Sequence, residues 1–162
     1  MRVLQSCIFP VAIYGFEAWT PLQADIKRLI AFEMTCYRKL LQISWTQKIT
    51  NEEVRARLKV TSSHLFSHYK KQKLSYFGHI KRHSTLEKTI LEGRIEGRRK
   101  RGRPRRRWVD NIQEWLHMSV VKAGKLAQNR DAFRGSVRAA MRQGTTFKAD
   151  ALTDDTRGSP TQ

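Results

Sequence analysis

The chain has 162 residues, of which 40% are hydrophobic, and it carries a formal net charge of +18 at pH 7. This length suits one domain with a modest core, and so large an excess of positive charge indicates a polyanionic partner. The only two cysteines, Cys7 and Cys36, lack the spacing of a zinc site or a disulfide scaffold. We therefore expect a reducing, intracellular compartment.

The first helix is predicted over residues 3–14, where apolar residues recur at helical spacing. Pro10 is expected to bend or restart this helix, because proline lacks the backbone N–H that a helix interior needs. The apolar run Cys7–Phe16 is too short to span a membrane, and polar Gln5 and Ser6 interrupt the pattern of a signal peptide. We expect this segment to belong to the core.

Four capping motifs predict the next four helices. A Thr-Pro start with a possible capping box at 20–23 precedes a long apolar stripe, and the motif TNEE at 50–53 opens a short helix. Ser62 or Ser63 begins another amphipathic pattern, and the motif STLE at 84–87 begins the last of the four. Each motif supplies side-chain acceptors for backbone N–H groups that a helix start leaves unpaired.

Residues 94–107 form a basic segment that holds nine cations and one acid. Its glycines and proline argue against a continuous helix. Helical spacing resumes at Trp108, and two more short helices are predicted at 119–128 and 130–142. The tail, 144–162, has almost no apolar residues and is expected to be disordered. Because no stretch alternates as a half-buried strand does, the expected fold class is mainly α.

The basic segment has the chemistry of a phosphate-binding site. Arginine donates two parallel hydrogen bonds to phosphate, and each neutralised phosphate releases counterions. The sequence Arg-Gly-Arg-Pro at 101–104 is similar to the core of an AT-hook: Gly102 allows close approach, Pro104 holds the backbone extended, and Arg101 and Arg103 are the candidates to enter a minor groove. The remaining candidates for phosphate contact are Arg94, Arg98, Arg99, Lys100, Arg105, Arg106 and Arg107. The alternatives are a nuclear import signal and a solvated basic loop.

Two weaker motifs point to other chemistry. The stretch GRRKRGR at 97–103 approaches a phosphate-binding Walker loop, but Arg103 and Pro104 replace the required Lys and Ser/Thr, and no apolar strand precedes it, so we reject it. The pairs His64/His68 and His79/His83 have the four-residue spacing of zinc ligands on a helix. Surface or half-buried histidines are the favoured interpretation, because no cysteine or well-placed carboxylate is near to complete four ligands.

The tryptophans and the aspartate pair also have two interpretations each. Trp108 and Trp115 share a helical face with Ile112, which favours packing onto the core over stacking on bases. Asp154 and Asp155 are adjacent acids, but polymerases hold metal ions with carboxylates on a rigid strand, and this pair lies in the polar tail. We expect no catalytic residue, metal, cofactor or small-molecule substrate.

Four segments resemble the region after the catalytic palm in reverse transcriptases of non-LTR retrotransposons, especially RTE-like and jockey-like elements. They are FPVAIYGFEAWT (9–20), AFEMTCYRKLLQISWTQKITNEEV (31–54), KLSYFGHIKRH (73–83) and ILEGRIEGRRKRGRPRRRWVDNIQEW (90–115). The resemblance extends over roughly residues 2–140 and implies a thumb-like helical region followed by a basic C-terminal region. The aromatic-x-Asp-Asp setting of a polymerase does not occur in the chain, so the resemblance implies part of an enzyme and no activity by itself.

The expected organisation combines these inferences. In chain order it comprises a thumb-like helical region 1–93, a basic linker 94–107, a short C-terminal helical region 108–143 and a disordered tail 144–162. The function expected is nucleic-acid binding, to DNA, RNA or a hybrid duplex, without membrane contact and in the nucleus or cytoplasm, with the nucleus favoured. The alternative is a non-catalytic relic or protein-interaction fragment whose basic run is an import signal.

Overall fold

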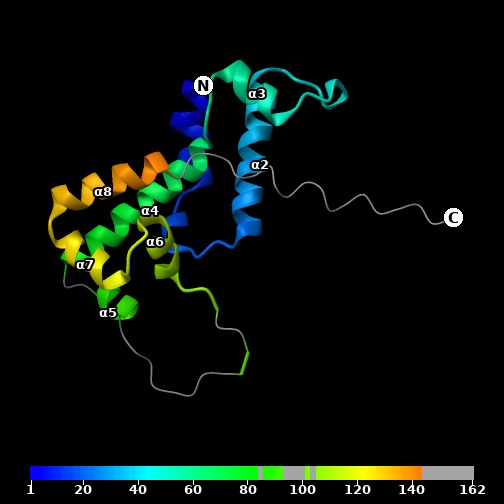
Figure 1. The fold of residues 1–162 in the computed structure, drawn as a ribbon. Helices are drawn as coiled ribbons and strands as arrows, with labels where there is room; N and C mark the ends of the chain where they lie inside the picture. The colour runs from blue at the N-terminus through cyan, green and yellow to red at the C-terminus, as the bar shows by residue number, and fades with distance from the viewer. Residues whose placement is uncertain (84–85, 93–100, 103–104, 144–162) are drawn as a thin grey trace.

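The computed structural model describes residues 1–83, 86–92, 101–102 and 105–143 (Figure 1). These residues form helices and short connections with no strand, which confirms the predicted mainly α fold. Within them, no helix is both long and apolar enough to cross a membrane. The elements are η1 (Leu4–Ile8), α1 (Phe9–Ala12), η2 (Phe16–Ala18), α2 (Gln23–Leu40), η3 (Trp45–Gln47), α3 (Asn51–Leu58), α4 (His64–Arg82), α5 (Leu86–Glu92), α6 (Trp108–Leu116), α7 (Val120–Gln128) and α8 (Arg130–Gln143).

The N-terminal helix changes character at Pro10. Residues Leu4–Ile8 make a π-helical turn, and an α-helical turn follows from Phe9 with the proline in its first turn. Because proline has no N–H to donate to the preceding turn, the hydrogen-bond pattern changes beside it from π to α, while the backbone stays helical through Ile8 and Phe9. Gly15 then adopts a left-handed conformation with φ of 70°, which ends the segment.

The start of α2 differs from the prediction. The predicted cap at Thr20 with Pro21 in the first turn is wrong, because α2 begins at Gln23 and Leu22 is the extended residue before it. The cap hydrogen bond comes from Asp25, whose Oδ2 accepts from the Leu22 backbone N–H at 3.0 Å. A carboxylate in the first helical turn is also favoured by the helix dipole, which explains the later start.

Two other predicted caps are confirmed. Thr50 Oγ1 accepts from the Glu53 backbone N–H at 3.3 Å and starts α3. Ser63 Oγ accepts from the Phe66 backbone N–H at 3.2 Å and starts α4. The predicted cap at Ser84 lies outside the described residues, as does the tail 144–162, so the expected disorder of the tail stays a prediction.

A buried acid, Glu33 on α2, fixes the beginning of α4. Its side chain is 1% exposed and accepts hydrogen bonds from the Tyr37 hydroxyl at 2.6 Å, from the Ser63 hydroxyl and from the His64 backbone N–H at 2.7 Å. The carboxylate therefore lies at the positive end of the α4 dipole. Burial, and then the bond to Glu33, raises the pKa of Tyr37 above its ordinary value.

The long helix α4 joins two hydrophobic clusters. Its first turn places Leu65 in a cluster with the N-terminal helices, and its middle places Leu74 and Phe77 in a second cluster with α6, α7 and α8. In Figure 1, α4 runs through the centre, with α2 on one side and α7 and α8 on the other. The second cluster therefore joins α4, which precedes the basic segment, to the three helices that follow it. The chain packs back against α4 after residue 107.

Candidate nucleic-acid interface

Five of the candidate residues in the basic segment are described: Arg101, Gly102, Arg105, Arg106 and Arg107. Arg101 and Gly102 are exposed. Gly102 has a φ of +124°, a backbone conformation that side-chain-bearing residues rarely adopt, so this position requires glycine. The candidates outside the described residues are Arg94, Arg98, Arg99, Lys100, Arg103 and Pro104.

The last three arginines of the segment divide into two kinds. Arg105 and Arg107 are exposed, whereas Arg106 between them is partly buried, with a side chain 30% exposed. The backbone at Arg107 is extended, with φ of −88° and ψ of 154°. Successive side chains of an extended chain point to opposite sides, so this stretch presents alternate arginines to solvent.

Arg106 anchors the segment to α6. Its guanidinium is ion-paired with Glu114 on that helix. Its Nε atom is buried and has no hydrogen-bond partner among the described residues. A side chain committed to an intramolecular pair has less freedom to reach a phosphate, so Arg106 differs in role from the arginines beside it.

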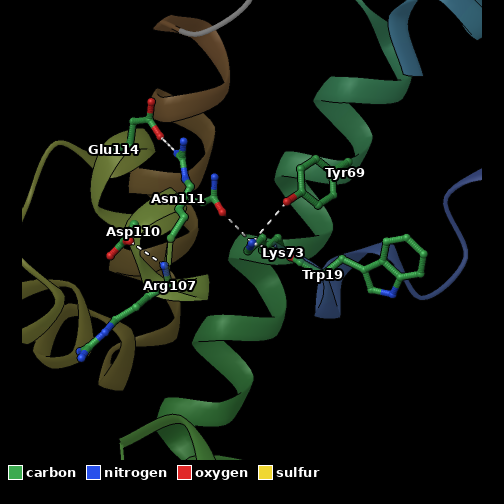
Figure 2. Close-up of polar contacts among 8 residues, drawn as sticks. Trp19, Tyr69, Lys73, Arg107, Asp110, Asn111 and Glu114 are labelled. Carbon is green, nitrogen blue, oxygen red and sulfur yellow. Dashed lines mark hydrogen bonds and ion pairs between the residues drawn. The ribbon is translucent and has the colours of Figure 1, made fainter. Parts of the chain in front are cut away.

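The backbone of Arg107 is fixed by the first turn of α6. Asp110 Oδ2 accepts from the Arg107 backbone N–H at 2.7 Å, the same kind of cap that starts α2 (Figure 2). The Arg107 side chain stays exposed. The basic segment therefore ends on a rigid helix start, with an arginine free at that point.

A buried lysine lies beneath this anchor. Lys73 on α4 has no exposed surface, and its Nζ donates to the Trp19 carbonyl at 2.9 Å, the Tyr69 hydroxyl at 3.3 Å and Asn111 Oδ1 at 3.0 Å (Figure 2). The Trp108 ring centroid is 4.9 Å away. Each acceptor comes from a different place in the fold, so one cation ties the end of η2, α4 and α6 together.

The environment of Lys73 lowers its basicity. Burial, and then the charge of Arg106, lowers the pKa of Lys73 to about 8. No carboxylate is among its three hydrogen-bond acceptors. These acceptors use all three donors of an ammonium group, so the lysine acts as a buried structural cation at neutral pH.

The two tryptophans of α6 pack onto the core, as predicted. The Trp108 indole N–H donates to the Glu17 carbonyl at 2.8 Å. The Trp115 ring lies edge-on to Tyr69, with centroids 5.5 Å apart, and Ile112 between the two tryptophans is fully buried. Both tryptophans are partly buried against the C-terminal cluster, which favours packing onto the core over base stacking.

The histidine pairs lie on α4 and at its end. Burial, and then the nearby His64, lowers the pKa of His68. The rings of His79 and His83 have centroids 4.4 Å apart. In the part of the chain that the structure describes, no three His, Cys, Asp or Glu side chains gather where they could hold a metal ion.

Sequence reasoning did not single out Lys73, nor the anchoring role of Arg106. A signal for Lys73 exists, since Tyr69, Lys73 and Phe77 are four residues apart on the buried face of α4. A charged residue within an apolar stripe indicates a buried cation that needs acceptors. The pairing of Arg106 with Glu114 has no comparable signal, because many arginines neighbour it in sequence.

Comparison of this chain with protein-family models, curated proteins and solved structures found no match. The resemblance to retrotransposon reverse transcriptases therefore stays a prediction from the four sequence segments.

Proposed function

We propose that this chain binds nucleic acid through phosphate contacts of the basic segment, residues 94–107, and carries out no catalytic step of its own. The observation that supports it most is the alternation at the end of the segment. Arg105 and Arg107 are exposed, while Arg106 between them is paired with Glu114 on α6. A backbone that is already anchored at Arg106 loses less conformational entropy when the neighbouring arginines bind phosphate.

The charge of the whole chain supports the same proposal. A net charge of +18 attracts any polyanion, and nine cations within 94–107 concentrate that attraction in one place. Binding through phosphates is largely independent of sequence, because phosphates carry no base information. The proposal includes origin as a fragment of a retrotransposon reverse transcriptase, from the resemblance alone. It also includes a nuclear or cytoplasmic location with the nucleus favoured, because the basic run is similar to an import signal.

The test is a titration of fluorescent 20-base-pair DNA, RNA and hybrid duplexes with the purified chain at several salt concentrations. Contact with about six to eight phosphates predicts a log–log slope of roughly −5 to −7 on duplex DNA. A slope near zero, or no binding at low salt, contradicts the proposal and leaves the import-signal interpretation.

The AT-hook part of the proposal has its own test. If Arg-Gly-Arg-Pro at 101–104 enters a minor groove, Arg103→Ala weakens binding more on A·T-rich than on G·C-rich duplex, since A·T tracts have narrow minor grooves. Equal weakening on both duplexes removes minor-groove binding and retains the phosphate contacts.

A further inference from the structure

A groove with a volume of about 530 Å³ runs between α4 and α8, away from the basic segment in sequence. Its lining is strongly cationic and contains no acid. The lining residues are Lys71, Ser75, His79 and Arg82 on α4, and Arg130, Phe133, Arg134, Val137 and Arg138 on α8.

The α8 wall carries a regular row of arginines. Arg130, Arg134 and Arg138 follow one another at four-residue intervals, and all three are exposed. With a rise of about 1.5 Å per residue, four residues advance about 6 Å along the helix. This interval is close to the spacing of successive phosphates along an extended strand, so the row matches a repeating anion.

The positive charges of the groove are poorly balanced by the protein. Asp131 Oδ1 lies 3.8 Å from Arg134 Nη1, but the aspartate side chain is 93% exposed and contributes little. Arg82 Nη1 donates to the Ala127 carbonyl at 3.0 Å, which fixes the guanidinium without neutralising it. Neighbouring cations repel one another, and a bound anion relieves that repulsion.

The floor of the groove is apolar and closely packed. Phe133 is 3% exposed and Val137 is 9% exposed, and both belong to the C-terminal hydrophobic cluster. Gly78 lets the two helices approach, because a Cβ at this position would lie 2.7 Å from Phe133 Cε1. Packed helices therefore set the backbone positions of the cations.

We propose that the groove between α4 and α8 binds the phosphate backbone of one strand of a nucleic acid, as a second contact separate from residues 94–107. The proposal rests on the proposed function, because it takes the same class of ligand. Because α8 packs against both α4 and α6, the groove and the anchored end of the basic segment belong to one helical unit. Two contacts in one rigid unit bind a single nucleic acid with increased effective concentration.

The first test replaces the arginine row in the full chain. The variant Arg130→Gln, Arg134→Gln, Arg138→Gln is compared with Lys27→Gln, Lys39→Gln, Lys48→Gln, which removes the same charge from exposed positions on and after α2. Circular dichroism checks that both variants fold. On a fluorescent single-stranded 20-mer, loss of three phosphate contacts is expected to reduce the salt slope by about 2 units, at about 0.7 per contact. An equal reduction in both variants contradicts a groove-specific contact.

The second test measures protection directly. Lys71 lines the groove and is exposed, whereas Lys59 is exposed at the end of α3. The single-stranded 20-mer is expected to slow acetylation of Lys71 at least several-fold and to leave Lys59 unchanged, as measured by mass spectrometry. Unchanged Lys71, or protection by polyglutamate and not by the oligonucleotide, overturns the proposal.

The two proposals fail in different ways. If the unaltered chain binds no oligonucleotide at low salt, the proposed function itself fails. A different result leaves the proposed function standing: the chain binds, and the variant Arg98→Ala, Arg99→Ala, Lys100→Ala, Arg101→Ala weakens binding. If the variant of the α8 row then has no effect and Lys71 is not protected, only the groove assignment fails.

Discussion

Lys73 is a buried lysine whose pKa departs strongly from its ordinary value. It is fully buried among a carbonyl, a hydroxyl and an amide oxygen, with its pKa lowered to about 8 from 10.5. Between these two pH values the unfolded chain keeps the proton and the folded chain releases it. Stability therefore rises with pH in this window, because the unfolded state binds more protons.

The lowered pKa of Lys73 predicts that the free energy of unfolding depends measurably on pH. The free energy of unfolding is expected to rise by on the order of 1 kcal/mol from pH 7 to pH 9 through Lys73 alone. In Lys73→Met that contribution disappears, so the difference in the free energy of unfolding between the unaltered chain and the variant is expected to change with pH. Urea denaturation of both proteins at several pH values measures it. A difference that is constant from pH 7 to pH 9 would show that the lysine titrates at its ordinary pKa.

We expect Arg106 to contribute mainly to stability, and Arg105 and Arg107 to contribute mainly to binding. Arg106→Ala removes the pair with Glu114 and is expected to lower the free energy of unfolding by about 1 kcal/mol. Arg105→Ala and Arg107→Ala are expected to leave stability nearly unchanged and each to reduce the salt slope on duplex DNA by about 0.9 units. Denaturation and binding are measured on all three variants. The assignment of roles is wrong if Arg106→Ala leaves stability unchanged and reduces the slope as much as the other two.

At the scale of helices, the local signals predicted element type well and some boundaries less well. Thr50 and Ser63 cap their helices as expected, since each hydroxyl accepts a hydrogen bond from the backbone N–H three residues later. The predicted cap at Thr20 failed because Asp25 accepts from the Leu22 backbone N–H, and a charged acceptor in the first turn outweighs a hydroxyl placed earlier.

The contact between α4 and α8 gives a prediction with an internal control. A Cβ on Gly78 would lie 2.7 Å from Phe133 Cε1, so Gly78→Ala is expected to destabilise the fold by about 1–3 kcal/mol through overpacking. Gly135 on α8 has nothing within 4 Å of such a Cβ. Gly135→Ala is expected to stabilise by about 0.5–1 kcal/mol, because alanine favours helix. Thermal unfolding of both variants tests the contrast, and equal effects would refute close packing at Gly78.

At the scale of the whole molecule, the sequence predicted the basic segment but not the cationic groove between α4 and α8. The run at 94–107 is visible because its cations are neighbours in sequence. The groove was missed because Lys71 and Arg138 come together only when α8 packs on α4. The arginines at every fourth position of α8 were a usable signal for one charged face, but helical spacing alone does not reveal the opposite wall.

Binding of phosphate by residues 94–107 is the central claim, and the salt slope of one variant tests it most directly. The variant is Arg98→Ala, Arg99→Ala, Lys100→Ala, Arg101→Ala. In its control, which loses the same charge, alanine replaces four exposed lysines: Lys27, Lys39, Lys48 and Lys125. On duplex DNA the fourfold variant is expected to lose about 3 to 4 units of slope, similarly for every sequence, and the control much less. An unchanged slope in the fourfold variant, or an equal loss in the control, would contradict the claim.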